Sequence, residues 1–234
     1  MKKRTKTRIH MLCVWSGMAF AVLTLIGGVL LSGFLPPPSA ALTSDEVAAI
    51  YRSNPDTIRL GMVMMMAAAA LFIPFTSLMA RYIIQVEEGV GVITIMQIMG
   101  GYSNMILFFY PCMWWLTAGF RPERNVELIS LMHDAGWLQF QGAMFPFLFM
   151  MISIAIAALV DDSNNPPYPR WLGFFSLLCA LMFIPDQMIF FFKTGPFAWN
   201  GLFPWWIPAI TFFGWIFTMF FVLRKAVIRE AQSA

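Results

Sequence analysis

Residues 170–193, RWLGFFSLLCALMFIPDQMIFFFK, form an apolar run with one cation at each end, Arg170 and Lys193. The run matches the length of about 20 apolar residues with which an α-helix crosses the hydrocarbon core of a bilayer. Asp186 lies deep inside it, flanked by Pro185 and Gln187, whereas the other acidic residues lie in connecting segments or tails. We therefore expect a membrane-spanning helix that carries one embedded carboxyl group.

The composition of the whole chain agrees with a membrane protein. Of its 234 residues, 59% are hydrophobic and 12% are charged, whereas an average soluble domain has about 25% charged residues. We expect an all-α, polytopic integral membrane protein that forms a single transmembrane domain over 1–234, with the lipid bilayer as its partner. The net charge of +3 is concentrated near the two ends and does not indicate a nucleic-acid partner.

Six apolar runs are predicted to span the membrane: 11–34, 60–80, 92–116, 137–160, 171–192 and 205–223. If the N-terminus is cytoplasmic, ten Lys and Arg residues lie on the cytoplasmic side and five on the other, as the positive-inside rule requires. We therefore expect a bacterial cytoplasmic membrane, a basic cytoplasmic tail over 1–10 and a cytoplasmic C-terminus. The first run exceeds the roughly 7–15 residues of a signal-peptide core, which favours a retained helix over cleavage after Ala40 or Ala41.

Two connections on the outer side are long enough to hold structure. Thr43-Ser44-Asp45-Glu46 has the pattern of a capping box and predicts a short helix toward Tyr51. Residues 122–134 place apolar side chains at helical spacing, as in a helix that lies at the membrane interface, although a plain amphipathic linker would show the same pattern. Tryptophans near the span ends, among them Trp115, Trp137 and Trp199, are typical of an aromatic belt.

An internal repeat is indicated by residues that recur 111 positions apart. Asn54-Pro55 recurs as Asn165-Pro166, and Phe72-Ile73-Pro74 recurs as Phe183-Ile184-Pro185. Repeat halves over 11–120 and 137–225 would each hold three spans, and an odd number of spans forces the halves into opposite orientations. Convergence from biased composition is the alternative. If the repeat is genuine, Pro74 and Pro185 kink helices at matched positions of the two halves, which is typical of a binding site between inverted repeats.

Asp186 is the first candidate for a substrate- or ion-binding residue. A charged side chain facing hydrocarbon costs about 2.5–3.5 kcal/mol on insertion scales, so this one should face the protein interior, hold a proton or meet a partner. Lys193, seven residues further on, would share its helical face and form the mouth of the same crevice. A buried acid that only bonds the carbonyl freed by Pro185, or a nearby amide, is the structural alternative.

The third span supplies polar candidates for the same pocket. Gln97, Gly101 and Asn104 stand on one helical face, with Gly100 and Ser103 beside them. The functional interpretation places Gln97, Asn104 and Gln187 around Asp186, with the glycine pair weakening the helix at mid-membrane. The alternative is a packing face against another helix, bonded by one or two amides. A stripe of small residues in the first span, which includes Gly17 and Thr24, predicts packing alone.

Metal, cofactor and conventional enzyme signatures are absent from the sequence. The three cysteines share no close spacing, and His10 and His133 lie beside no ligand cluster, so we expect neither a metal site nor a haem. No catalytic motif is recognisable, and no catalytic residue is assigned.

Three functional hypotheses follow. The first is a secondary carrier or channel for a small or hydrophobic solute, with its polar site around Asp186. The second is a non-catalytic accessory subunit that docks partner membrane subunits. The partner could also be another copy of the chain, which would give a homo-oligomer. The third is an enzyme or binding protein for a lipid-like substrate. We adopt the first because of the repeat and the embedded carboxyl group.

Overall fold

Every regular element in the described residues, 3–34 and 36–233 of the computed structural model, is helical. In chain order the elements are α1 (Lys3–Leu25), η1 (Ile26–Leu31), α2 (Ser44–Ser53), α3 (Pro55–Val86), α4 (Val92–Phe120), α5 (Val126–Gly142), α6 (Phe145–Val160), α7 (Arg170–Met182), η2 (Ile184–Phe190), η3 (Gly195–Phe197), η4 (Leu202–Trp206) and α8 (Ile207–Ser233). Of the short elements, η1 and η4 are π-helical turns, while η2 and η3 are 3-10 helices.

Six helical stretches of the described chain are long and apolar enough to cross a membrane: Lys3–Leu31, Pro55–Val86, Val92–Phe120, Val126–Val160, Arg170–Phe190 and Gly195–Gln232. They coincide with the six predicted spans, so the prediction of an all-α polytopic membrane protein is confirmed. The predicted short helix after Thr43 is also present as α2, with both hydrogen bonds of the capping box formed. The segment after Pro122 is helical as well, and it continues through Trp137 as α5.

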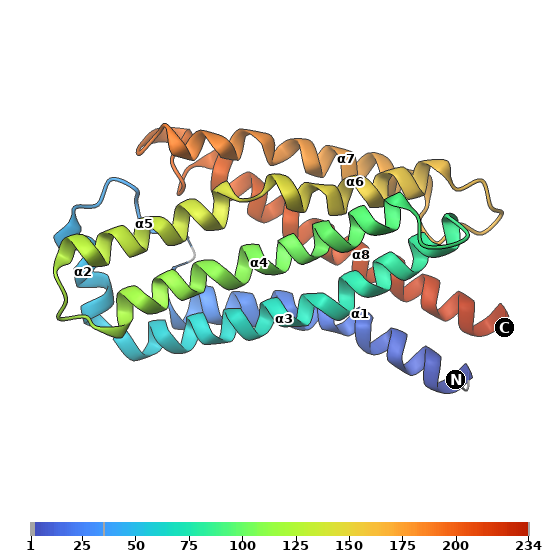
Figure 1. Ribbon diagram of the computed structural model, residues 1–234, viewed down its shortest axis with the longest axis horizontal. Coiled ribbons are helices and arrows are strands. Elements are labelled where there is room, and N and C mark those ends of the chain that lie inside the picture. The colour runs from blue at the N-terminus through green and yellow to red at the C-terminus, as the bar shows by residue number, and fades with distance from the viewer. Residues whose placement is uncertain (1–2, 35, 234) are drawn as a thin grey trace.

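The spanning helices form a closed ring in chain order. Helix α1 packs on α3, α3 on α4, α4 on α6, α6 on α7 and α7 on α8, and α8 returns to α1 (Figure 1). Both termini and the turns at 87–91 and 161–169 lie at one end of the ring, which we call the terminal end. Helices α2 and α5 lie at the opposite end, the loop end.

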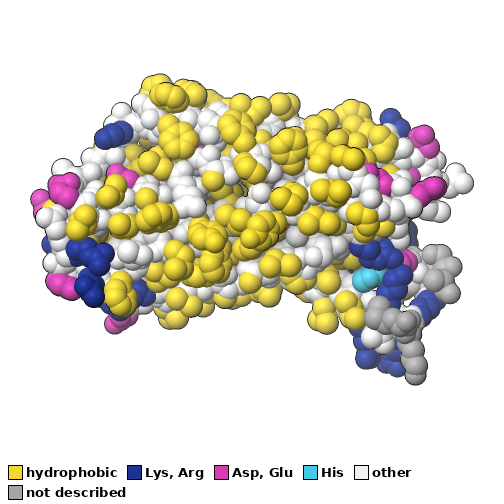
Figure 2. Space-filling view, viewed as in Figure 1, with side chains coloured by type: hydrophobic (Ala, Val, Ile, Leu, Met, Phe, Trp, Pro, Cys, Tyr) yellow, Lys and Arg dark blue, Asp and Glu magenta, His cyan; other side chains and the backbone are white. Residues whose placement is uncertain are grey.

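Hydrophobic side chains cover the long middle of the molecule, whereas charged side chains gather at its two ends (Figure 2). Large apolar residues such as Leu30, Ile210 and Phe221 are more than 60% exposed. In water such a surface would be costly, but it suits the hydrocarbon core of a bilayer. The surface therefore agrees with the six candidate spans.

Glu230 of α8 joins three helices at the terminal end. Its carboxylate lies 2.8 Å from Lys6 Nζ of α1 and 2.7 Å from Arg81 Nη2 of α3. The hydroxyl of Tyr82 donates to the same group at 3.2 Å, and His10 Nδ1 lies 3.7 Å away. This network closes the seam where the first and last spans of the ring meet.

Glycines allow the closest approach between helices α3, α4 and α6. A Cβ atom at Gly101 would overlap Thr76 Oγ1 of α3, and one at Gly100 would overlap the backbone nitrogen of Met150 in α6. Helix α4 is unbroken across both glycines, and α3 is unbroken across Pro74. The small residues therefore set the distance between neighbouring helices.

The fifth span differs from the continuous helix expected over 171–192. The α-helix ends at Met182 and the chain continues as a 3-10 helix, in which the amide of Asp186 donates to the carbonyl of Phe183 at 3.2 Å. Pro185 explains the change, because its ring lacks an N–H group and clashes with the carbonyl four residues earlier. Lys193 consequently lies in a bend after the helix rather than on a helical face shared with Asp186. The inverted relation between the two halves stays a prediction.

Candidate functional site

A cavity lies inside the helix ring, where α1, α4 and α8 face the junction of α5 and α6. The empty space between its wall atoms is about 560 Å³, which includes the open mouth. The volume that the centre of a water molecule can occupy is about 60 Å³. Its wall is mostly apolar and includes the rings of Phe108, Phe140, Phe147, Phe183, Phe212 and Trp205. A concave apolar space with few polar groups is the usual form of a small-molecule site.

Two polar side chains line this cavity, and each has an unpaired oxygen. Thr24 is 2% exposed, and its hydroxyl has no hydrogen-bond partner. Gln141 is 3% exposed, and its Nε2 donates to the carbonyl of Trp199 at 2.8 Å. Because a carbonyl can only accept, this bond fixes the amide orientation and leaves Oε1 unpaired. An unpaired buried polar atom costs about 1–3 kcal/mol, so both oxygens favour a bound partner.

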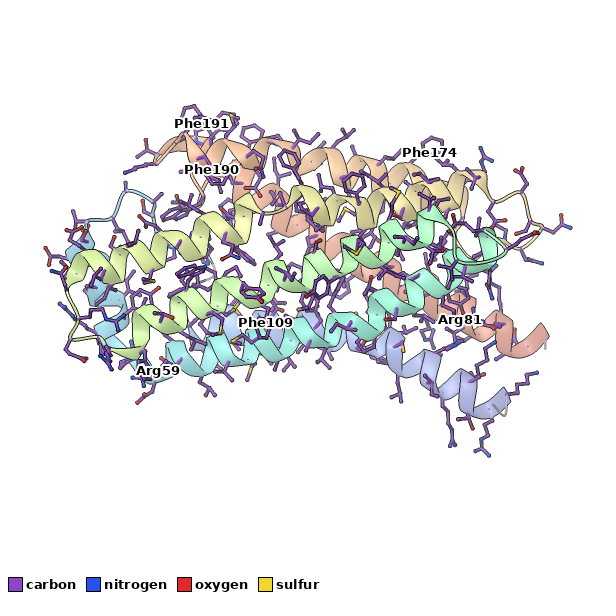
Figure 3. The ribbon with its side chains drawn as sticks, viewed as in Figure 1. Arg59, Arg81, Phe109, Phe174, Phe190 and Phe191 are labelled. Atoms are coloured by element: carbon purple, nitrogen blue, oxygen red, sulfur yellow. The ribbon has the colours of Figure 1, made fainter. Side chains whose placement is uncertain are left out.

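The break between α5 and α6 places Gln141 at the cavity wall. Helix α5 ends at Gly142, where the amide of Ala143 bonds the carbonyl of Gln139 at 3.3 Å, and Pro146 occupies the first turn of α6. A Cβ atom at Gly142 would overlap the ring of Phe190. The glycine thus lets η2 pack directly on the end of α5, at the loop end of the ring where Figure 3 labels Phe190 and Phe191.

Asp186 lies in η2, one 3-10 turn beyond the cavity-lining Phe183. The side chain is fully buried, and neither carboxyl oxygen has a hydrogen-bond partner. Elements α5 and η4 pack against η2, so the segment forms part of the wall between the cavity and the loop end. An ionised carboxylate without a partner is very costly in such a place. Asp186 therefore calls for a proton or for a donor on a bound molecule.

The neighbours of Asp186 have different surroundings. Gln187 is half-buried, and its Nε2 lacks a hydrogen-bond partner. Lys193 is exposed to solvent. Within the described residues, no group of three or more His, Cys, Asp or Glu side chains is arranged to hold a metal ion.

The polar residues of α4 lie closer to the terminal end. Gln97 and Asn104 are fully buried on one face, and Gln97 Nε2 contacts Thr76 Oγ1 at 3.1 Å and Met79 Sδ at 3.3 Å, both on α3. Ser103 is exposed and bonds the carbonyl of Met99 in its own helix. Gln97 thus belongs to the α3–α4 seam, whereas Asp186 lies near α5 at the other end of the ring.

Among the polar candidates on α4, Asn104 lies nearest in sequence to the residues that line the cavity. Both atoms of its amide lack hydrogen-bond partners, although the side chain is fully buried. Leu107 and Phe108, one helical turn further on, line the cavity. Unpaired polar groups therefore occur on both sides of the cavity, at Asn104 and at Asp186.

A second cluster of aromatic residues lies at the loop end, beside the cavity. Phe34, Tyr51, Trp115, His133, Trp137 and Trp199 contact one another through ring pairs with centroids 4.8–6.3 Å apart. Trp115, Trp137 and Trp199 are at most 6% exposed. The expectation that these three belong to a lipid-facing belt is therefore wrong. They form the core that holds α2 and α5 onto the ring.

The sequence interpretation missed Thr24 and Gln141 as site residues. Thr24 was assigned to a packing stripe because its neighbours along that face are small. Gln141 lies in an apolar run beside Phe140 and two residues after Gln139, and these two amides are the signal that the sequence offers. Only the folded ring shows that the two side chains line the same space.

Comparison of the chain with protein-family models, with curated protein sequences and with solved structures yields no match. The fold and surface themselves define the class: a polytopic α-helical membrane protein. Its six candidate spans surround a small, mostly apolar cavity.

Proposed function

We propose that the protein is a secondary carrier or channel for a small solute, which passes through the interior of the helix ring. The cavity is the observation that supports this proposal, because it lies among the spanning helices and is lined by two residues, Thr24 and Gln141, that each have an unpaired polar oxygen. The solute would move between this cavity and the two ends of the ring. Asn104 and Asp186, which lack partners on either side of the cavity, would contact it along the way.

Asp186 would link the movement of the solute to a proton. Its buried carboxyl group lacks a protein donor, and acidic side chains inside transporters commonly serve in proton relays. Binding and release of one proton at Asp186 would change the polarity of the wall formed by η2. The cavity would therefore bind the solute with a different affinity before and after Asp186 takes up a proton.

The orientation in the bilayer follows from the distribution of cations. The terminal end carries the basic tail as well as Arg81, Arg170 and Arg229, whereas the loop end carries fewer Lys and Arg residues. Under the positive-inside rule, the terminal end faces the cytoplasm of a bacterial cell. The solute would then enter or leave the outer side next to α5 and η2.

Flux in reconstituted vesicles tests this proposal. Proteoliposomes with a pH-sensitive dye in their lumen would be mixed with 1,2-propanediol in a stopped-flow instrument, and both swelling and luminal pH would be recorded. The proposal predicts swelling several-fold faster than in protein-free vesicles, accompanied by a pH change. In Asp186→Asn the pH change should be lost while the variant still purifies as a folded protein.

Asp162→Asn serves as the matched control, because Asp162 is an exposed acid in the connection between α6 and α7. It should retain both the swelling rate and the pH change. Swelling of wild-type vesicles at the protein-free rate would contradict the carrier proposal. Normal pH coupling in Asp186→Asn would contradict the role given to Asp186.

A non-catalytic accessory subunit is the second candidate. Leu128 and Leu131 on α5 are 47% and 59% exposed at the loop end, and such a pair suits contact with a partner helix or with another copy of the chain. Purification in a gentle detergent, followed by mass spectrometry, tests this alternative. Stoichiometric partners lost in Leu131→Glu would support an accessory role, whereas a protein that purifies alone would favour the carrier.

A further inference from the structure

We propose that the ring cavity binds a small, uncharged molecule with an apolar body and at least one hydroxyl group. The inference rests on the proposed function, in which this molecule is the solute. It adds the chemical class of the ligand, which follows from the charge, the hydrogen-bonding groups and the size of the cavity.

The lining requires an uncharged ligand. Thr24 and Gln141 are the polar side chains among the described lining residues, and no charged side chain occurs there. A charged molecule would lose its hydration without gaining a counter-charge, which costs far more than the transfer of a neutral molecule. The surrounding rings, among them Phe108, Phe147 and Phe212, offer an apolar body dispersion contacts instead.

The two unpaired oxygens select a hydroxyl group. Gln141 Oε1 is an amide oxygen and can only accept a hydrogen bond; the bond from Nε2 to the Trp199 carbonyl fixes which end of the amide is the oxygen. The hydroxyl of Thr24 can either donate or accept. A ligand hydroxyl donates one hydrogen and accepts on its oxygen, so its hydrogen-bonding capacity complements either residue. An ether oxygen only accepts, and it leaves Gln141 unsatisfied.

The volume limits the ligand to a small molecule. One water needs roughly 10–15 Å³ of space counted by its centre, and the cavity offers about 60 Å³ by this measure. The space therefore holds roughly four to six water molecules, which suits a molecule with comparably few non-hydrogen atoms. A short alcohol fits these limits, whereas a lipid or a sterol does not.

Two isomers that differ only in the position of oxygen test the inference. 3,3,3-Trifluoropropan-1-ol carries a hydroxyl group, and 2,2,2-trifluoroethyl methyl ether has the same formula without one. Their binding to the full chain in lipid nanodiscs would be measured by fluorine NMR line broadening, with protein-free nanodiscs as the blank. The alcohol should bind about three- to tenfold more tightly, which corresponds to one net hydrogen bond.

Thr24→Val removes one oxygen and keeps the shape of the side chain. Binding of the alcohol should weaken about three- to tenfold, and binding of the ether should weaken as well, because both ligand oxygens can accept from the Thr24 hydroxyl. Thr218→Val is the matched control, because Thr218 is exposed on α8 and bonds Gly214 in its own helix. Ala209→Phe fills the cavity from α8 and should abolish the binding of both isomers.

Equal affinity for the two isomers, or binding that survives Ala209→Phe, would overturn the inference. The absence of protein-dependent binding of either isomer would assign the cavity to ordered water and would overturn it as well. These results are separate from the flux measurement. Alcohol binding without transport would support the ligand class and contradict the carrier proposal. Transport without alcohol binding would support the carrier proposal and contradict the ligand class.

Discussion

The hydroxyl of Tyr51 in α2 lies 2.9 Å from Nδ1 of His133 in α5, and both side chains are fully buried. Burial raises the pKa of Tyr51 well above its ordinary value, so the phenol keeps its hydrogen at neutral pH. If the phenol donates to Nδ1, one polar group, His133 Nε2, is left without a partner. The opposite direction would leave the phenol hydrogen unpaired as well, so donation by Tyr51 is favoured.

Tyr51→Phe should lower the stability of the protein by about 1–3 kcal/mol, because it leaves buried Nδ1 of His133 unpaired. Thermal unfolding in detergent would measure the loss, and limited proteolysis would show whether α2 detaches. Tyr110→Phe is the control, since the side chain of Tyr110 is 50% exposed on α4. Equal melting temperatures for the two variants would show that the Tyr51–His133 contact adds no stability.

Asp186→Leu should raise the melting temperature by a few degrees. The substitution removes a buried carboxyl group without hydrogen-bond partners and replaces it with an apolar side chain in an apolar wall. Removing such a group recovers about 1–3 kcal/mol. The pH change that accompanies flux should be lost in the same variant, because its proton-binding carboxyl group is removed. A lower melting temperature would indicate a stabilising partner for Asp186 in the folded protein.

Gly100→Ala should destabilise the protein by about 1–3 kcal/mol through overpacking. Its Cβ atom would overlap the backbone nitrogen of Met150, which cannot move away as a flexible side chain could. Gly89→Ala is the matched control, because a Cβ atom there meets open space. Both variants would be compared by thermal unfolding in the same detergent. A Gly100→Ala variant as stable as Gly89→Ala would show that α4 and α6 can separate at little cost.

Glu87 caps helix α4 and should make its stability depend on pH. Its carboxylate accepts bonds from the amide of Ile93 at 3.0 Å and from the amide and hydroxyl of Thr94 at 2.8 and 2.7 Å. Partial burial acts to raise its pKa, but these hydrogen bonds outweigh that effect and hold the pKa below 4.5. The stabilisation is therefore complete above the ordinary pKa and is lost as the pH falls through the lowered value.

Glu87→Ala should cost about 1 kcal/mol at neutral pH, which is typical of a lost helix cap. The difference from the wild-type protein should close as the pH falls through the lowered pKa of Glu87, where the carboxylate becomes protonated. Thermal unfolding across this pH range would measure it, with Glu123→Ala, an exposed substitution before α5, as the control. A difference that does not change with pH would contradict the capping role.

The sequence predicted the helices whose formation depends on residues close together in the chain. The capping box at Thr43 and Glu46 produced α2, because all its partners lie within four residues. The six apolar runs predicted six spans, since an unsatisfied backbone in lipid must form hydrogen bonds within each helix. The end of α7 was the exception, because Pro185 allows either a kinked α-helix or the 3-10 segment that is present.

The candidate site could be predicted only in part. Asp186 was visible in the sequence because a carboxyl group in an apolar run is rare. Its expected neighbours Gln97 and Ser103 came from α4, but Gln97 packs against Thr76 in the α3–α4 seam and Ser103 is exposed. The sequence shows which residues share a helical face, and it does not show which neighbour that face meets.

The sequence by itself determined the helical class, the approximate spans and the presence of one embedded acid, because hydrophobic length and local capping act within a single segment. The tertiary structure alone decided the ring order and the cavity, because both depend on contacts between residues far apart in the chain. Thr24 and Gln141 line one space only because α1 and the end of α5 meet inside the closed ring. Their unpaired oxygens result from that packing.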